Sequence, residues 1–218
     1  MPMLATQILG YFVLAGAVAA MATGAAGLFA ARLRAVVIYS AILQGGYVLL
    51  GFAASLISGQ GDGHTAAVFQ AIAAGAGVGL MWIAARALSA EAGDSLPLPD
   101  DAAPSAWAVF CFALACMSLV GLPPLAGLPA KIAVIHAGLR APGVLFLATV
   151  GAAALGAVSL WAYAGIVLPL ITGPVTKAPV AVSLRLRTLV DVLIAALLCL
   201  GLAPYIGYAI AAAFTGGR

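Results

Sequence analysis

A run of three prolines and two glycines lies inside one of the long apolar stretches of this chain. The run covers residues 118–131, Ser-Leu-Val-Gly-Leu-Pro-Pro-Leu-Ala-Gly-Leu-Pro-Ala-Lys, within an apolar stretch at residues 106–137. Proline removes a backbone donor and clashes with the preceding helical turn. Freed backbone groups are tolerated at membrane depth only beside protein or a water-filled cavity. The pattern therefore predicts a membrane helix that is broken between Gly121 and Pro124.

The composition indicates a polytopic membrane protein. Of the 218 residues, 65% are hydrophobic and 7% are charged, a balance that a water-soluble globular domain of this size would not show. No basic stripe accompanies the net charge of +3, so nucleic acid is not an expected partner. The sequence shows no nucleotide loop, haem-attachment motif, iron–sulfur spacing or clustered metal ligands. We therefore expect neither a cofactor nor a metal.

Apolar stretches of about 20 residues, the length that crosses a bilayer as a helix, predict an all-α membrane protein with six transmembrane helices. These form one membrane domain, residues 1–218, with spans at residues 7–30, 35–57, 65–88, 106–137, 142–172 and 188–214. The first 30 residues are uncharged, so the N-terminus is predicted to be a membrane helix without the basic leader of a signal peptide. Segment 89–105, with four acidic residues and three prolines, is predicted to be a solvated cytoplasmic loop.

The basic residues predict the orientation in the membrane. An even number of spans places both termini on one side. The connections on the opposite side contain Arg32, Arg34, Arg86, Lys177, Arg185 and Arg187, whereas the side of the termini has only Arg140 and Arg218. By the positive-inside rule the richer side is cytoplasmic. The chain is thus expected in the inner (cytoplasmic) membrane with both termini facing outward.

Small residues spaced four apart predict where helices pack closely, because such pairs let backbones approach each other. The pairs are Gly16 and Ala20, Gly75 and Gly79, and Ala152 and Gly156.

Two segments resemble those of one protein family. Residues 118–131 resemble the Ser-Leu-x-Gly-x-Pro-Pro-x-x-Gly-Phe-x-x-Lys motif of the antiporter-like membrane subunits of respiratory complex I, which Mrp-type sodium/proton antiporters and membrane-bound hydrogenases share. Residues 34–47, Arg-Ala-Val-Val-Ile-Tyr-Ser-Ala-Ile-Leu-Gln-Gly-Gly-Tyr, resemble the family's Lys-Arg-x-Leu-Ala-Tyr-Ser-Ser-x-x-x-x-Gly-Tyr segment. Leu128 replaces the usual phenylalanine, and Pro129 is an addition.

The resemblance implies a fold and a missing part. Subunits of that family have fourteen helices, with two inverted five-helix repeats that each contain one broken helix. The six predicted spans resemble the second repeat plus the trailing last helix. The first repeat, with the family's glutamate–lysine pair, is therefore expected to be absent, and another chain is a candidate to supply it.

The resemblance also implies roles for individual residues. Lys131 corresponds to the family's lysine in the second broken helix, at the outward end of a proton relay, and Gln44 falls where relatives place histidine or glutamine. The third span has Gln70 but lacks the histidine and lysine of many relatives. The residues that correspond to the helix break itself are Ser118, Gly121, Pro123, Pro124 and Gly127.

Each of these residues has a structural alternative. Burying a lone ammonium costs at least several kcal/mol unless it is paired, hydrated or neutral. Lys131 is therefore expected either to line a polar cavity and exchange protons, or to extend outward or bond a neighbouring carbonyl. His136, near the outward helix end, is either a proton relay or an interfacial cap. Gln44 and Gln70 either bind water or bond across the bundle.

One ion pair is predicted near the membrane surface. Arg187 and Asp191, four residues apart, can pair on one helix face, or they can contact a partner subunit.

The leading hypothesis is a shortened antiporter-like subunit of a larger, complex I-like ion-translocating complex, with part of a proton path through Lys131. Such a chain is at most a non-catalytic membrane subunit of a redox-driven proton pump such as NADH:quinone oxidoreductase, and its partners are other integral membrane subunits and lipids. One alternative is a non-transporting structural or assembly subunit. Another is the membrane part of an inorganic-carbon uptake system, because such systems also use relatives of this family.

Overall fold

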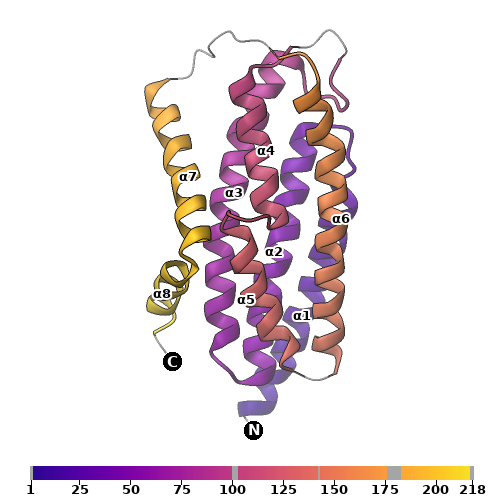
Figure 1. Ribbon diagram of the computed structural model, residues 1–218. Coiled ribbons are helices and arrows are strands. Elements are labelled where there is room, and N and C mark those ends of the chain that lie inside the picture. Colours follow the sequence, from indigo (N-terminus) through magenta and orange to yellow (C-terminus); the bar gives the residue numbers. More distant parts are fainter. Residues whose placement is uncertain (1, 100–102, 142, 176–182, 217–218) are drawn as a thin grey trace.

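The protein is all-helical, as predicted. The computed structural model describes residues 2–99, 103–141, 143–175 and 183–216, and these form eight helices (Figure 1). The helices are α1 (Pro2–Gly27), α2 (Leu33–Ser58), α3 (Asp62–Ala92), α4 (Ala106–Val120), α5 (Gly127–Leu139), α6 (Val144–Thr172), α7 (Leu184–Leu202) and α8 (Pro204–Phe214). Of the charged residues used above, Asp100, Asp101, Lys177 and Arg218 lie outside the described residues.

Length and composition make four of the described helices, α1, α2, α3 and α6, long and apolar enough to cross a membrane. The pair α7 and α8 also passes this test when taken together, which makes up to five spans by length alone. The remaining apolar helices are shorter, with 15 residues in α4 and 13 in α5. The chain is therefore a multi-pass membrane protein, and its fourth apolar stretch folds as two separate helices.

The prediction of one trailing helix over residues 188–214 is wrong. The stretch bends by 100° between α7 and α8. Pro204 is the first residue of α8 and has no backbone N–H, and a residue before proline disfavours the helical conformation. Ala203 accordingly has φ −125° and ψ 66°, outside the helical region. Pro204, which causes the bend, is visible in the sequence. The prediction of a single helix considered only the length of the apolar stretch and did not take this proline into account.

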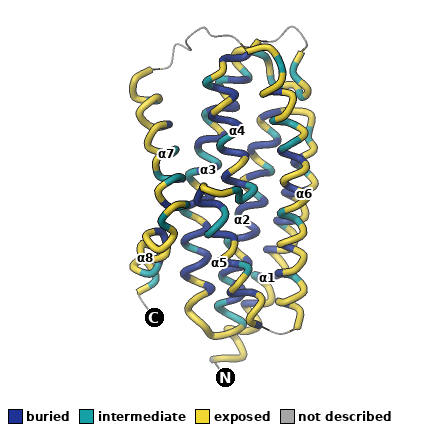
Figure 2. Tube along the Cα trace, in the orientation of Figure 1, coloured by how far each residue is buried: buried dark blue, intermediate teal, exposed yellow. Residues whose placement is uncertain are grey.

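Buried residues form a core that runs along the length of the bundle (Figure 2). Tyr47, Phe69 and Phe112 are at most 1% exposed, and leucine and alanine side chains fill the space around them. The outer faces of α1, α6 and α7 remain exposed and apolar, with Phe12 at 72% and Trp161 at 77%. Such surfaces suit lipid or neighbouring membrane helices.

Close helix packing depends on glycines other than the predicted pairs. A Cβ atom added to Gly46 would lie 2.9 Å from the backbone nitrogen of Met21 in α1, and one added to Gly63 would lie 2.7 Å from the carbonyl oxygen of Gly51 in α2. A Cβ at Gly75 would meet nothing within 4 Å. The spacing of small residues therefore did not indicate the tight contacts at Gly46 and Gly63, although Ala152 of one predicted pair is buried against α2.

Part of the predicted 89–105 loop is tied to the bundle. α3 continues to Ala92, so the helix extends beyond the predicted boundary at residue 88. Asp94 then accepts a 3.1 Å hydrogen bond from the backbone N–H of Arg34 at the start of α2. Glu91 accepts a 2.7 Å bond from the backbone N–H of Ser105, the residue before α4. Acidic side chains of this segment therefore help to fix the starts of two helices.

The α1–α2 contact provides a test of the fold. Gly46→Ala should lower the free energy of unfolding by about 1–3 kcal/mol, because the added methyl group overpacks a site already in contact with α1. Gly45→Ala is the matched control, because its added methyl group meets nothing within 4 Å. We expect it to leave the stability unchanged or raise it by up to about 1 kcal/mol. Unfolding of both variants in mixed micelles measures the difference, and equal effects would contradict this packing.

Candidate functional site

The interruption between α4 and α5 follows from backbone geometry. α4 ends at Val120. The next residue, Gly121, has a φ of 94°, in the left-handed region that glycine adopts without strain. The N–H of Leu122 turns back to the carbonyl of Met117 at 2.9 Å, as in a Schellman end. At the start of α5, a Cβ on Gly127 would collide with the carbonyl oxygen of Ser118. Both glycines of the predicted break are therefore required by the path of the chain.

The interruption is also bonded to α7. The backbone N–H of Ala126 donates a 2.9 Å hydrogen bond to the carbonyl of Leu197. Gly201 lies against the backbone of Pro124 so closely that a Cβ atom would not fit. The segment between α4 and α5 is thus held by a helix far along the sequence.

Lys131 lies in the second turn of α5 and is buried, with 6% of its surface exposed. Its ammonium donates to the carbonyl of Leu119 and, at 3.0 Å, to that of Val120. These are among the last carbonyls of α4, which have no partner in their own helix and carry the negative end of its dipole. The Lys131 nitrogen also lies 4.8 Å from the ring centroid of Tyr47, within cation–π distance. Lys131 therefore caps the C-terminal end of α4, where the interruption begins.

Gln44 and Gln70 extend this polar arrangement across the bundle. The Gln44 amide donates a 2.9 Å hydrogen bond to the same Leu119 carbonyl, and the Gln70 amide donates a 2.9 Å bond to the Gln44 side-chain oxygen. Both glutamines are at most 2% exposed. The result is one continuous line of polar groups from α3 through α2 to the interruption, which we call the glutamine–lysine line: Gln70, Gln44, the Leu119 carbonyl and Lys131.

Two buried polar atoms beside this line have no hydrogen-bond partner among the described residues. They are the Gln70 side-chain oxygen and the Ser118 hydroxyl. Buried polar groups are nearly always hydrogen-bonded, and ordered water commonly serves where protein groups do not. The site thus combines satisfied carbonyls with two free acceptor positions.

Sequence reasoning missed Tyr163, a second buried polar contact between α2 and α6. Its hydroxyl donates to the Ser40 hydroxyl at 2.7 Å, and Ser40 donates to the Val36 carbonyl at 2.6 Å. Tyr47 likewise donates to the Ala152 carbonyl of α6 at 2.6 Å. A tyrosine in the middle of an apolar span was the available signal, because a buried phenol usually has a partner.

Other predicted site residues lie away from the glutamine–lysine line. His136 is exposed near the end of α5. Arg187 and Asp191 are both exposed on α7, and the predicted ion pair does not form within 4.0 Å. The ion pairs among the described residues are instead Arg34–Asp94 at 3.8 Å and Arg140–Asp62 at 2.9 Å. Each joins residues 60 or more positions apart, which no local spacing could indicate.

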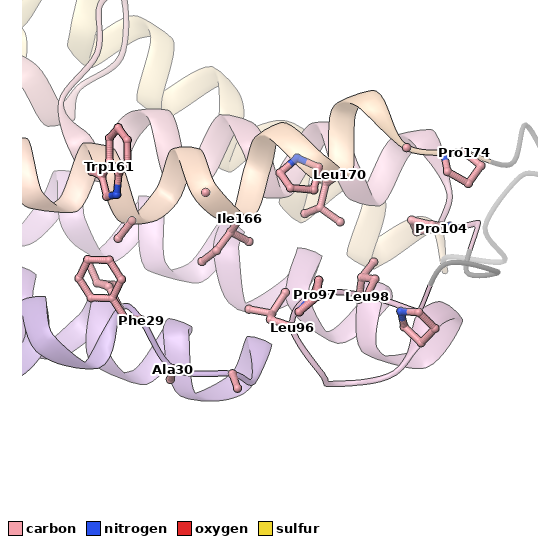
Figure 3. Close-up of a pocket in the computed structure, with 17 residues that line it drawn as sticks. Phe29, Ala30, Leu96, Pro97, Leu98, Pro104, Trp161, Ile166, Leu170 and Pro174 are labelled. Atoms are coloured by element: carbon pink, nitrogen blue, oxygen red, sulfur yellow. The ribbon is translucent and has the colours of Figure 1, made fainter.

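An apolar pocket of about 540 Å³ lies on the surface, away from the glutamine–lysine line (Figure 3). Phe29 just after α1, Leu96 and Pro97 in the segment between α3 and α4, and Trp161 and Ile166 of α6 contribute to its walls. None of the predicted relay residues lines it. Among the described residues, no group of three or more histidine, cysteine or acidic side chains is placed to hold a metal ion.

Fold and site together define a multi-pass helical membrane protein with a buried lysine at a helix interruption. Residues 1–156 match the family model described as NADH:quinone oxidoreductase/Mrp antiporter, transmembrane. The chain belongs to this family, which confirms the resemblance drawn from residues 34–47 and 118–131.

Similar proteins come from several membrane complexes. NADH-quinone oxidoreductase subunit N of Methylobacterium nodulans is 34% identical over 137 residues, which cover 62% of this chain and 28% of that protein. A chain of the Mrp complex from Dietzia sp. has a TM-score of 0.78 at 19% identity, over 96% of this chain and 48% of the other. A chain of respiratory complex I from Thermus thermophilus has a TM-score of 0.67 at 26% identity, over 93% and 44%. This chain therefore spans half or less of the proteins that it matches.

The central position of Gln44 provides a test of the site. Gln44→Leu removes the donor to Leu119 and the acceptor for Gln70, so we expect the free energy of unfolding to fall by about 1–2 kcal/mol. Gln60→Leu is the control, because Gln60 is exposed in the α2–α3 turn, and we expect a change within about 0.5 kcal/mol. Unfolding in mixed micelles measures both. A Gln44→Leu variant as stable as the control would show that the glutamine–lysine line is not formed.

Proposed function

We propose that this chain is an antiporter-like subunit of a larger ion-translocating membrane complex and contributes part of a proton path through Lys131. The observation that carries the proposal is the buried lysine at the interruption, joined to Gln44 and Gln70 by the Leu119 carbonyl. Family membership supports the class of protein, and the site supports the role within it.

In this proposal α4 and α5 form one discontinuous span. At 1.5 Å per residue, 15 and 13 residues extend about 22 and 20 Å, each less than the roughly 30 Å of a bilayer core. Together they suffice, and with α7 and α8 counted as one bent span the chain crosses six times. The start of α1 and the end of α8 lie at the same end of the bundle (Figure 1). This supports termini on one side of the membrane, and by the positive-inside rule we propose that they face outward from the inner membrane.

The surroundings of Lys131 support a role in proton transfer. The Leu119 and Val120 carbonyls and the Tyr47 ring can stabilise the ammonium in place of a permanent counter-ion. A lysine amine held in this way is a candidate group for proton exchange. The amides of Gln44 and Gln70 both donate and accept, and the free Gln70 oxygen and Ser118 hydroxyl are positions where water can bind.

His136 is the proposed outward continuation of this path. It follows Lys131 by five residues on α5, about 7–8 Å along the helix axis, and it is exposed. An imidazole carries both a donor and an acceptor nitrogen and can pass protons between solvent and a buried amine. The rest of the path needs groups that this chain does not supply.

The missing groups are proposed to come from partners. The similar structures are chains of multi-subunit membrane assemblies, and this chain matches less than half of each one. Inverted-repeat transporters use both halves around a central site. We infer that the chain corresponds to the second repeat and last helix, and that the first repeat is contributed from outside residues 1–218.

Replacing Lys131 tests the proton path directly. We expect Lys131→Met to reduce proton translocation by the purified native assembly at least about tenfold, because a positioned proton-transfer group contributes this much or more. The variant should leave the yield of the assembly unchanged. The control is Ile132→Ala, because Ile132 is the neighbouring residue of α5 and is 55% exposed. Proton uptake into proteoliposomes, followed with a pH-sensitive dye, measures both.

A structural role is the second candidate. It is favoured by the hydrogen bonds from Lys131 to two helix-terminal carbonyls, which would stabilise the interruption even without proton transfer. An unchanged pump with a lower yield of assembled complex in Lys131→Met would establish this reading and overturn the proton path.

The proposed partners provide a separate test. A tag on this chain should recover stoichiometric integral membrane subunits from mild detergent, including a chain with the first repeat, because half of a two-repeat path has no complete route across the membrane. Mass spectrometry identifies them. Recovery of the chain alone, active in ion transport, would contradict the need for partners.

A further inference from the structure

A basic pocket of about 260 Å³ lies between α2 and α3, at the end of the bundle opposite the termini. Arg34 and Val37 of α2 line one side, and the other side is lined by Trp82, Ala85, Arg86, Ser89 and Ala90 of α3. Trp82, Arg86 and Ser89 follow each other at helical spacing, so they share one face of α3. The pocket is unrelated to the glutamine–lysine line, none of whose side chains lines it.

The charges in this pocket are incompletely neutralised. The Nε atom of Arg34 lies 3.8 Å from Oδ1 of Asp94, and the same carboxylate oxygen accepts from the Arg34 backbone N–H and the Ser89 hydroxyl. No carboxylate of the described residues lies within 4.0 Å of the Arg86 guanidinium. Two arginines and one carboxylate leave a formal charge of +1 around the pocket. An anion is therefore the ligand that this arrangement favours.

The surroundings indicate where the pocket lies relative to the membrane. Trp82, one turn from Arg86 toward the middle of α3, is 43% exposed, and exposed tryptophans gather at the level of lipid headgroups. Ile38, one turn beyond Arg34 on α2, is 53% exposed. Charged groups thus lie at the helix ends and apolar side chains follow directly below them. This order matches a phospholipid, with its phosphate above and its acyl chains beneath.

We propose that Arg34 and Arg86 bind the phosphate of an anionic phospholipid whose acyl chains extend along the exposed faces of α2 and α3. A guanidinium offers two parallel N–H donors to a phosphate, and basic pockets between membrane helices attract anionic headgroups. Ser89 lies within the pocket as a further polar contact. A zwitterionic lipid carries an opposing ammonium, so the net charge of the pocket favours a lipid with net negative charge.

The experiment uses photoactivatable phosphatidylglycerol added to the native assembly in mild detergent, followed by peptide mapping of this chain. We expect labelling within residues 34–38 and 82–90, and we expect Arg86→Gln to lower it about fivefold, the effect of one basic group near an anionic headgroup. Arg185→Gln is the matched control, because Arg185 is exposed near the same end of the bundle but outside the pocket. It should leave labelling unchanged.

Competition experiments on the wild-type assembly distinguish a lipid phosphate from free inorganic phosphate without any amino-acid substitution. In them, unlabelled compounds compete with the photoactivatable probe. Unlabelled phosphatidylglycerol should displace the probe, whereas phosphatidylcholine and millimolar inorganic phosphate should not. Displacement by inorganic phosphate would replace the lipid proposal with a soluble-anion site. Equal loss of labelling in Arg86→Gln and Arg185→Gln would overturn the pocket in favour of a diffuse surface charge. A copurifying acidic protein segment cross-linked at Arg86 would overturn it as well.

Discussion

The end of α4 in the apolar interior is the feature on which the site depends. A helix that stops leaves its last carbonyls without intrahelical partners, and an unpaired polar group costs several kcal/mol in a membrane. Here the Leu119 and Val120 carbonyls accept hydrogen bonds from the Lys131 ammonium, and the Leu119 carbonyl also accepts one from the Gln44 amide. The interruption and the buried lysine are therefore physically coupled, because the unpaired carbonyls need hydrogen-bond donors and the buried ammonium needs acceptors.

The same coupling explains why α7 matters to a site that contains none of its side chains. The bond from Ala126 to the Leu197 carbonyl fixes the segment between α4 and α5. The close approach of Gly201 to Pro124 leaves no space for a side chain there. The bend at Pro204 follows immediately. α7 thus acts as a support for the interruption, through backbone contacts at Leu197 and Gly201.

Three of the polar groups described above lie at different depths of the bundle. The glutamine–lysine line crosses the interior, the Arg140–Asp62 pair closes one end of the bundle, and Arg34, Arg86 and Asp94 occupy the other. Between them the surface is apolar and exposed. This distribution suits a chain whose outer surface faces lipid or other membrane helices.

The sequence by itself determined the all-helical membrane class and predicted an interruption after Gly121, because apolar length, proline and glycine act locally; it also singled out Lys131, which the structure buries. The family also followed from residues 34–47 and 118–131. Only the tertiary structure decided which carbonyls Lys131 contacts, which glycines mediate close packing and which acids pair with Arg34 and Arg140. It also replaced the predicted single last helix with two helices that meet at a bend, and it does not bring Arg187 and Asp191 within 4.0 Å of each other. These features depend on groups many residues apart, whose meeting is set by how the helices pack and not by spacing along the chain.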